Sequence, residues 1–308
     1  MKNKPSGPPW RLVLRVLAGA GAAGMLFLAG ATIARSARTA QVNDTLSRMH
    51  GQAPEATVSG AAIPTVAAPA ATAIPAARRK AAPAGVSRMG FPDGSAIPAP
   101  MGEAAGTGAG NGVFHRTGTE EGMLQNLREL KQINGDLVGW IHIDGVLDLP
   151  VVYRDNAWYL NHDFYGNRNP SGTLFLDEYH PLKSGTQNLL IHGHNMKDGS
   201  MFALLTHYTS DSFLKAHSLI TFSTLWETEI YQVFAVLRVS SRTEDPDYFN
   251  YFSHPVFAAE ADCREYLAEL QRRAVQRLDL PADPGKALLE LSTCVGDDRI
   301  VVAAQRIL

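Results

Sequence analysis

The stretch "ALLELSTCVGDDRIVVAAQRIL" occupies residues 287–308 and predicts two strands joined by a turn. Its first part alternates so that Leu289 and Leu291 share one face while Ser292 and Cys294 share the other. The letters "VGDD" predict a tight turn, after which a second apolar run begins. The pattern therefore places a cysteine at the end of a strand, which is a rigid position for a reactive group.

A thiol at a strand end is a candidate nucleophile, provided that a base lies near it. Few thiols are ionised at neutral pH, and an imidazole that takes the proton raises their nucleophilicity. The run "NLLIHGHN", residues 188–195, breaks at Gly193 and offers His192 and His194. If the strand continues through Gly193, both imidazoles lie on one face, so the local pattern leaves both open. A purely structural histidine is the competing interpretation.

Attack on an amide also builds negative charge on a carbonyl oxygen, which a cation or backbone N–H groups must stabilise. Arg299 opens the last strand and can return to the side of Cys294 across the turn. The alternative is a surface arginine paired with Asp297 or Asp298.

The same strand-like composition recurs along the second half of the chain. Short apolar or alternating runs bounded by turn residues lie at 138–143, 149–153, 172–177, 188–193, 218–224, 230–240, 287–293 and 299–308. Helical spacing is present at 120–134, before the first run, and helical composition at 201–217 and at 253–278, between the sixth and seventh runs. Eight short strands predict a closed or sandwiched β-structure.

The N-terminal part has a different composition. No charged residue occurs from Val16 to Ala34, and the preceding flank is more basic than the following one. These features predict a cytoplasmic N-terminus (1–15), a transmembrane signal anchor (16–34) and an extracellular remainder. A cleaved secretory signal is the alternative. Residues 35–118 are rich in Ala, Pro and Gly, which predicts a disordered tether, so the folded domain is 119–308.

The composition argues against a nucleic-acid-binding protein and against a disulfide scaffold. A net charge of −2 and a pI of about 6.6 argue against a nucleic-acid partner, which usually requires a basic face. The two cysteines, Cys263 and Cys294, are too few for a disulfide scaffold; they are either free or paired with each other.

No cofactor or metal is expected. Four metal-ligand residue types lie in two neighbouring segments without a spacing that favours zinc, and turn or surface roles are expected for them; they are His162, Asp163, Asp177 and His180.

Four segments taken in order resemble a sortase, and specifically the class B subgroup. They are "LKQINGDLVGWIHIDGVLDLPVV", "WYLNHDFYGNRNPSGTLFLDEY", "LLIHGHNMKDGSMFALL" and "LSTCVGDDRIVVAAQRI". The resemblance covers residues 123–308. It implies an eight-stranded sortase-type β-barrel, mostly β, with an N-terminal helix and a helix inserted between strands 6 and 7.

The resemblance also implies a thiol transpeptidase with a Cys294, His194 and Arg299 active site. Because an aromatic residue commonly precedes Gly-His in the family, His192 takes that place and His194 the catalytic one. Ser292 and Thr293 are implied to line the substrate groove. The implied substrates are surface proteins or pilins of a Gram-positive cell with an Asn-Pro-x-Thr or Leu-Pro-x-Thr sorting signal, cleaved through a thioester on Cys294.

The implied acceptor is an amine of a cell-wall peptide or a pilin lysine, which leads to wall anchoring or pilus assembly. Two alternatives stay open. One is a cysteine protease, a hydrolase in which water resolves the thioester. The other is a catalytically silent binding module tethered to the membrane.

Overall fold

The computed structural model describes residues 37–51, 123–180 and 185–308. Residues 37–51, within the predicted tether, form a helix. The remaining tether residues, 35–36 and 52–118, and the predicted segments 1–15 and 16–34 lie outside the described residues.

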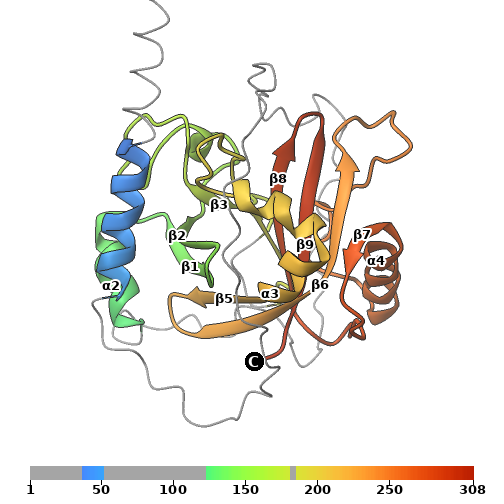
Figure 1. Cartoon of the computed structure of the whole chain (residues 1–308). Helices are drawn as coiled ribbons and strands as arrows, with labels where there is room; N and C mark the ends of the chain where they lie inside the picture. Colours follow the sequence, from blue (N-terminus) through green and yellow to red (C-terminus); the bar gives the residue numbers. More distant parts are fainter. Residues whose placement is uncertain (1–36, 52–122, 181–184) are drawn as a thin grey trace, which may run out of the picture. The chain divides into compact units, whose positions relative to one another are not determined.

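The folded region is a mixed β-structure with few helices (Figure 1). Its strands are β1 (Leu137–Ile143), β2 (Leu147–Val152), β3 (Leu174–Leu176), β4 (Asn188–His192), β5 (Leu219–Thr224), β6 (Thr228–Ser240), β7 (Ala274–Arg277), β8 (Leu288–Val295) and β9 (Asp298–Arg306). Its helices are α2 (Gln125–Ile133), α3 (Asp211–Ala216) and α4 (Glu260–Arg273), with 3-10 turns η2 (Trp158–Leu160) and η3 (Ala203–Thr209).

Eight of these strands close into a barrel. The strand order is β5-β1-β2-β3-β4-β8-β9-β6, and β6 pairs back onto β5 to close the ring. Closure removes the free sheet edges that would otherwise expose unpaired backbone groups. The predicted mostly-β, eight-stranded sortase-type barrel with an N-terminal helix is confirmed, and α2 is that helix.

Two apolar clusters hold the barrel together. The first fills the interior with inward-facing side chains, among them Ile141, Phe222, Leu289 and Leu291. The second lies outside, where α4 packs its buried residues, including Tyr266 and Leu270, on β6, β8 and β9. Alternation along β8 gives this strand a part in both clusters, since Leu289 and Leu291 face the interior and Leu288 faces α4.

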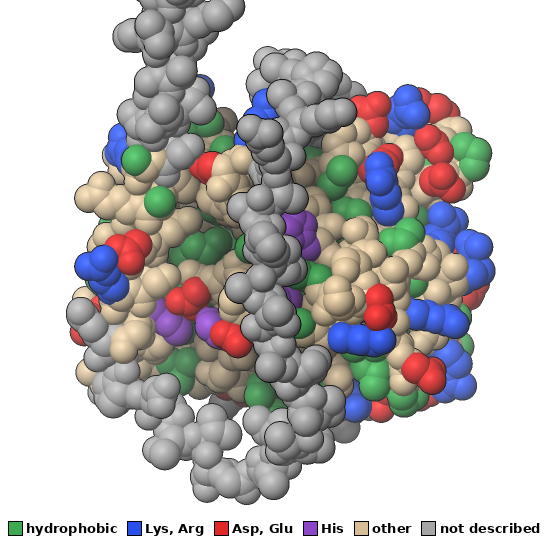
Figure 2. Space-filling model, viewed as in Figure 1, with side chains coloured by type: hydrophobic (Ala, Val, Ile, Leu, Met, Phe, Trp, Pro, Cys, Tyr) green, Lys and Arg blue, Asp and Glu red, His purple; other side chains and the backbone are tan. Residues whose placement is uncertain are grey.

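The outer face of α4 is strongly charged. In Figure 2, Lys, Arg, Asp and Glu side chains gather on the side where Figure 1 shows α4. Arg264 pairs with Glu260, and both Arg272 and Arg273 pair with Glu269. Pairing at helical spacing marks this face as the solvent side of the inserted helix.

Two predicted helices differ from the structure. The predicted helix at 201–217 is divided into η3 and α3, which are separated at Ser210. The predicted helix at 253–278 is shorter, because its C-terminal residues form β7, which pairs with β6 at residues 235–237. Backbone hydrogen bonds to the edge of β6, which would otherwise be unpaired at residues 235–237, outweigh the helical propensity of residues 274–277.

The predicted localisation requires a correction. A membrane span needs about 20 consecutive apolar residues. Among the helices of residues 37–51, 123–180 and 185–308, none is long and apolar enough to cross a bilayer. This finding contradicts the prediction of a single-pass membrane protein with an extracellular catalytic domain, and that prediction is not retained.

Gly193 occupies a place that no larger residue can enter. A Cβ atom at this position would lie 2.7 Å from the ring of Phe202 and would also clash with the side chain of Leu174. The backbone that follows β4 therefore packs directly on the apolar core.

We expect Gly193→Ala to lower the free energy of unfolding by about 1–3 kcal/mol, because the added methyl group overpacks this contact. Urea unfolding of the full chain followed by fluorescence measures the change. The matched control is Gly135→Ala, where an added Cβ has no neighbour within 4 Å; it should change stability by less than about 0.5 kcal/mol. Equal effects of the two substitutions would contradict the close packing of Gly193.

Candidate active site

Three neighbouring strands bring the predicted catalytic residues into one row. β8 and β9 are antiparallel, and Cys294 lies directly opposite Arg299. β4 and β8 are parallel, and their last pair joins His192 to Ser292. The chain stays beside β8 after that pair, because Gly193 N donates to Ser292 O at 3.2 Å. His194 therefore follows two residues after His192, just beyond the end of β4, and Cys294 is two residues after Ser292 on β8.

Cys294 is partly exposed and lies at the end of β8. Burial raises the pKa of its thiol, while the positive charge of Arg299 acts in the opposite direction. Its backbone carbonyl accepts a hydrogen bond from Asn195 Nδ2 at 2.9 Å. The residue after His194 is thus bound to the backbone of Cys294, which fixes the separation of the two segments.

The imidazole of His194 is held by a backbone carbonyl. Its Nε2 lies 2.7 Å from the oxygen of Leu160, which ends η2. A carbonyl can only accept, so Nε2 carries the proton and, in the neutral ring, Nδ1 is left as an acceptor. The backbone oxygen of His194 accepts from Phe202 N at 2.9 Å. Both the ring and the main chain of His194 are therefore fixed.

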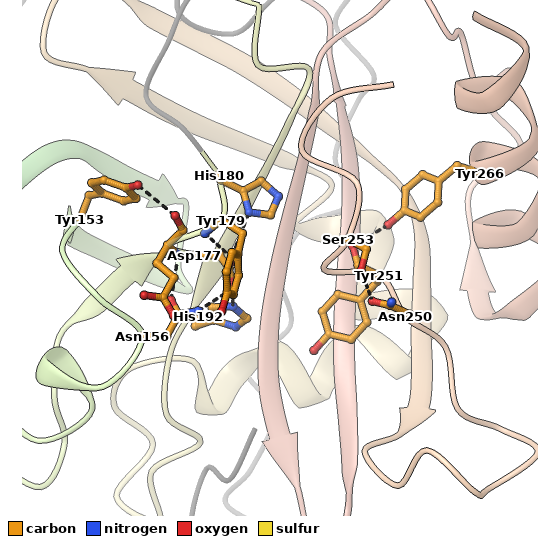
Figure 3. Close-up of polar contacts among 11 residues, drawn as sticks. Tyr153, Asn156, Asp177, Tyr179, His180, His192, Asn250, Tyr251, Ser253 and Tyr266 are labelled. Carbon is orange, nitrogen blue, oxygen red and sulfur yellow. Dashed lines mark hydrogen bonds and ion pairs between the residues drawn. The ribbon is translucent and has the colours of Figure 1, made fainter. Parts of the chain in front are cut away.

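His192, the rival base, has a different environment. It is 5% exposed, and its Nε2 lies 2.9 Å from Oδ2 of Asp177. Figure 3 shows His192 and His180 directed toward this carboxylate. Periodicity could not choose between His192 and His194 as the base. The hydrogen bonds favour His194, since His192 belongs to a buried cluster around Asp177.

Arg299 is not engaged in the surface ion pairs that were its alternative interpretation. Asp298 pairs with Arg238 at 2.7 Å, and Asp297 lies 4.0 Å from Arg242. The Nη1 of Arg299 donates to the backbone oxygen of Asp298 at 3.3 Å. Within the described ranges, no ion pair joins Arg299 to a carboxylate, so its charge remains available beside Cys294.

Ser292 and Thr293 are both buried. Ser292 Oγ lies 2.8 Å from the hydroxyl of Tyr251, and Thr293 Oγ1 donates to Gly193 O at 2.7 Å. Thr293 therefore ties the end of β8 to the end of β4. A direct role of either side chain in lining the substrate groove stays a prediction.

Several residues near the site had no local sequence signal. Tyr251 is buried beneath Ser292, and burial raises its pKa to about 12. Asp177 is also buried, and its hydrogen bonds join residues that are distant in sequence. Asn195 could have been found, because it directly follows His194. The turn role expected of Asp177 is confirmed, since its Oδ1 accepts from Tyr179 N, whereas a surface role is wrong for Asp177 and His180 because both side chains are buried.

Both cysteines are free thiols. Cys263 is buried in α4, where burial raises its pKa to about 11. Within the part of the chain that the structure covers, no three His, Cys, Asp or Glu side chains are grouped so that they could hold a metal ion. Metal-independent action stays a prediction.

Comparison with known proteins agrees with this geometry. The family model described as "Sortase domain" matches residues 141–307. Sortase B of Listeria monocytogenes is 31% identical over 54% of this chain and 66% of the relative, slightly less than two thirds of its length. Sortase B of Staphylococcus aureus is 30% identical over 60% of this chain and 76% of the relative.

A solved structure of a Staphylococcus aureus sortase B-substrate complex is also similar. It superposes with a TM-score of 0.55 at 31% identity, covering 60% of this chain and 86% of the other. The family model spans more than half of the chain, and these relatives share one subgroup. The chain therefore belongs to the sortase family and is a class B sortase.

Proposed function

We propose that this sortase transpeptidase cleaves an Asn-Pro-x-Thr or Leu-Pro-x-Thr sorting signal through a thioester on Cys294 and passes the acyl group to an amine. The observation that carries the proposal is the strand register that sets Cys294 opposite Arg299 and beside the segment of His194. A nucleophile, a base and a cation on three paired strands are the groups that acyl transfer requires.

In the first half-reaction, Nδ1 of His194 accepts the proton of the Cys294 thiol, because Nε2 is occupied by Leu160. The sulfur attacks the carbonyl carbon of the signal's Thr, and the C–N bond between that carbon and the next residue breaks in the resulting tetrahedral species. The departing amine takes the proton from the imidazolium, which leaves a thioester and a neutral imidazole.

Arg299 acts on the oxygen of the same carbonyl. Negative charge develops there in the transition state, and a preorganised guanidinium stabilises that charge more strongly than water does. The Arg238–Asp298 pair supports this role, since it engages the carboxylate of the residue that directly precedes Arg299.

In the second half-reaction an amine attacks the thioester and gives its proton to His194, and Cys294 is released. We propose an amine of a cell-wall peptide or a pilin lysine as the acceptor. The Staphylococcus aureus sortase B structure is a complex with its substrate, and its similarity to this chain supports a substrate site in the same fold.

The transfer reaction is tested with the full chain, a sorting-signal peptide and triglycine as a simple primary amine. We expect a product whose mass equals the N-terminal fragment through Thr joined to triglycine. Cys294→Ala should reduce its formation to background, whereas Cys263→Ala should retain it. If the fragment carries only a free carboxylate with every amine tested, the enzyme is a hydrolase and the proposal of transfer is wrong.

The charge of Arg299 also generates a pH prediction. A cation near the sulfur favours the thiolate and lowers the pKa of Cys294. In Arg299→Met that pKa should rise, so the pH midpoint of iodoacetamide alkylation shifts to higher pH and the rate at pH 7.5 falls. Arg299→Lys keeps the charge and should shift the midpoint less. An unchanged midpoint in Arg299→Met would show that the two groups do not interact.

A further inference from the structure

We propose that Asp177 is a positioning residue that fixes His194 by binding, at the same time, the two segments that hold its imidazole. This inference rests on the proposed role of His194 in acyl transfer. In the described structure Asp177 makes no hydrogen bond to His194, so its effect is transmitted through other residues.

Asp177 directly follows β3 and is 1% exposed. Its Oδ2 accepts hydrogen bonds from His192 Nε2 at 2.9 Å and from Asn156 Nδ2 at 3.0 Å. Its Oδ1 accepts from Tyr179 N at 2.9 Å and lies 3.3 Å from His180 Nδ1. Figure 3 shows Asn156 and His192, which belong to two other segments, beside Asp177.

The first arm of this cluster leads to the backbone of His194. His192 is the last residue of β4, and only Gly193 separates it from His194. A Cβ atom at Gly193 would clash with Leu174 and Phe202, so the backbone between His192 and His194 packs closely on these side chains. A fixed His192 side chain therefore fixes the direction in which β4 delivers His194.

The second arm leads to the partner of the His194 ring. Asn156 lies four residues before Leu160, whose carbonyl accepts from His194 Nε2. The link between Asn156 and the Asp177 segment is double, because Glu178 N also donates to Asn156 Oδ1 at 2.9 Å. Asp177 thus connects the strand that carries the imidazole to the segment that orients it.

The charge of Asp177 strengthens both arms. Burial alone would favour the neutral acid, but the hydrogen bonds and charges of His180 and His192 hold the pKa of this carboxyl below its usual range. Hydrogen bonds to an ionised acceptor are stronger than those between neutral groups. Removing the charge should therefore loosen His192 and, with it, the end of β4.

The chain offers a matched control in Asp163. This carboxylate is 2% exposed and accepts hydrogen bonds from Tyr165 N and Asn167 N within one turn. It is the same residue type and is similarly buried, and its side chain bonds within its own loop, with Asn167 Nδ2 among the donors, rather than to His192 or Asn156. A general cost of removing a buried charge should therefore be similar in Asp163→Asn and Asp177→Asn.

The experiment compares the full wild-type chain with Asp177→Asn and Asp163→Asn by two independent measurements. The first is kcat and KM for peptide cleavage. The second is NMR of the ¹⁵N-labelled histidine rings, with the His194 signals assigned from a His194→Gln variant. Asp177→Asn should lower kcat by on the order of 10- to 100-fold, because small misplacements of a catalytic group have effects of this size.

KM should change by less than about twofold, since Asp177 does not contact the substrate in this account. The Nε2–H signal of His194 should shift or broaden in Asp177→Asn and stay unchanged in Asp163→Asn. Asp177→Glu, which keeps the charge, should recover part of kcat.

An unchanged His194 signal in Asp177→Asn would overturn the inference, and so would an equal fall of kcat in Asp163→Asn. The NMR result does not depend on turnover. If the wild-type chain failed to cleave any sorting peptide, the proposed function would fail while the positioning of His194 by Asp177 could still be measured.

Discussion

The parallel pairing of β4 with β8 is the constraint on which the site depends. It joins two segments about a hundred residues apart, and it is reinforced beyond the last strand pair by Gly193 N to Ser292 O and by Thr293 Oγ1 to Gly193 O. A parallel pair has no tight turn to set its register. These contacts between the strand ends therefore keep the segment of His194, the proposed base, beside that of Cys294, the proposed nucleophile.

The antiparallel pairing of β8 with β9 is set differently. The short turn at Gly296, whose φ is 64°, fixes this register locally and puts Arg299 opposite Cys294. A left-handed backbone is available to glycine without steric cost. Cys294 and Arg299 are thus placed by local sequence, whereas the position of His194, the proposed base, depends on contacts across the barrel.

This difference explains how far the sequence could predict the molecule. The alternation of apolar and polar residues along 287–293 and the apolar run at 299–308 predicted β8 and β9 directly, because side-chain period and turn chemistry are local properties of the sequence. The last residues of the predicted helix at 253–278 have helical composition but form β7, because the edge of β6 with which they pair exists only in the folded state.

Periodicity could not separate His192 from His194. The preference for His194 came from a family resemblance, which the hydrogen bonds then supported. Asp177 was assigned no function because the two partners that connect it to the site, His192 and Asn156, lie 15 and 21 residues away.

The central claim is that Cys294, and not the other thiol, carries the acyl group. Burial in α4 raises the pKa of Cys263 to about 11, which leaves it a poor nucleophile. The direct measurement is mass spectrometry of the intact protein after brief incubation with a sorting-signal peptide and no amine, followed by proteolytic mapping of the adduct. The account predicts a mass increase equal to the acyl fragment, mapped to Cys294 and absent from Cys294→Ala. Peptide cleavage without any adduct on Cys294, or an adduct on Cys263, would contradict it.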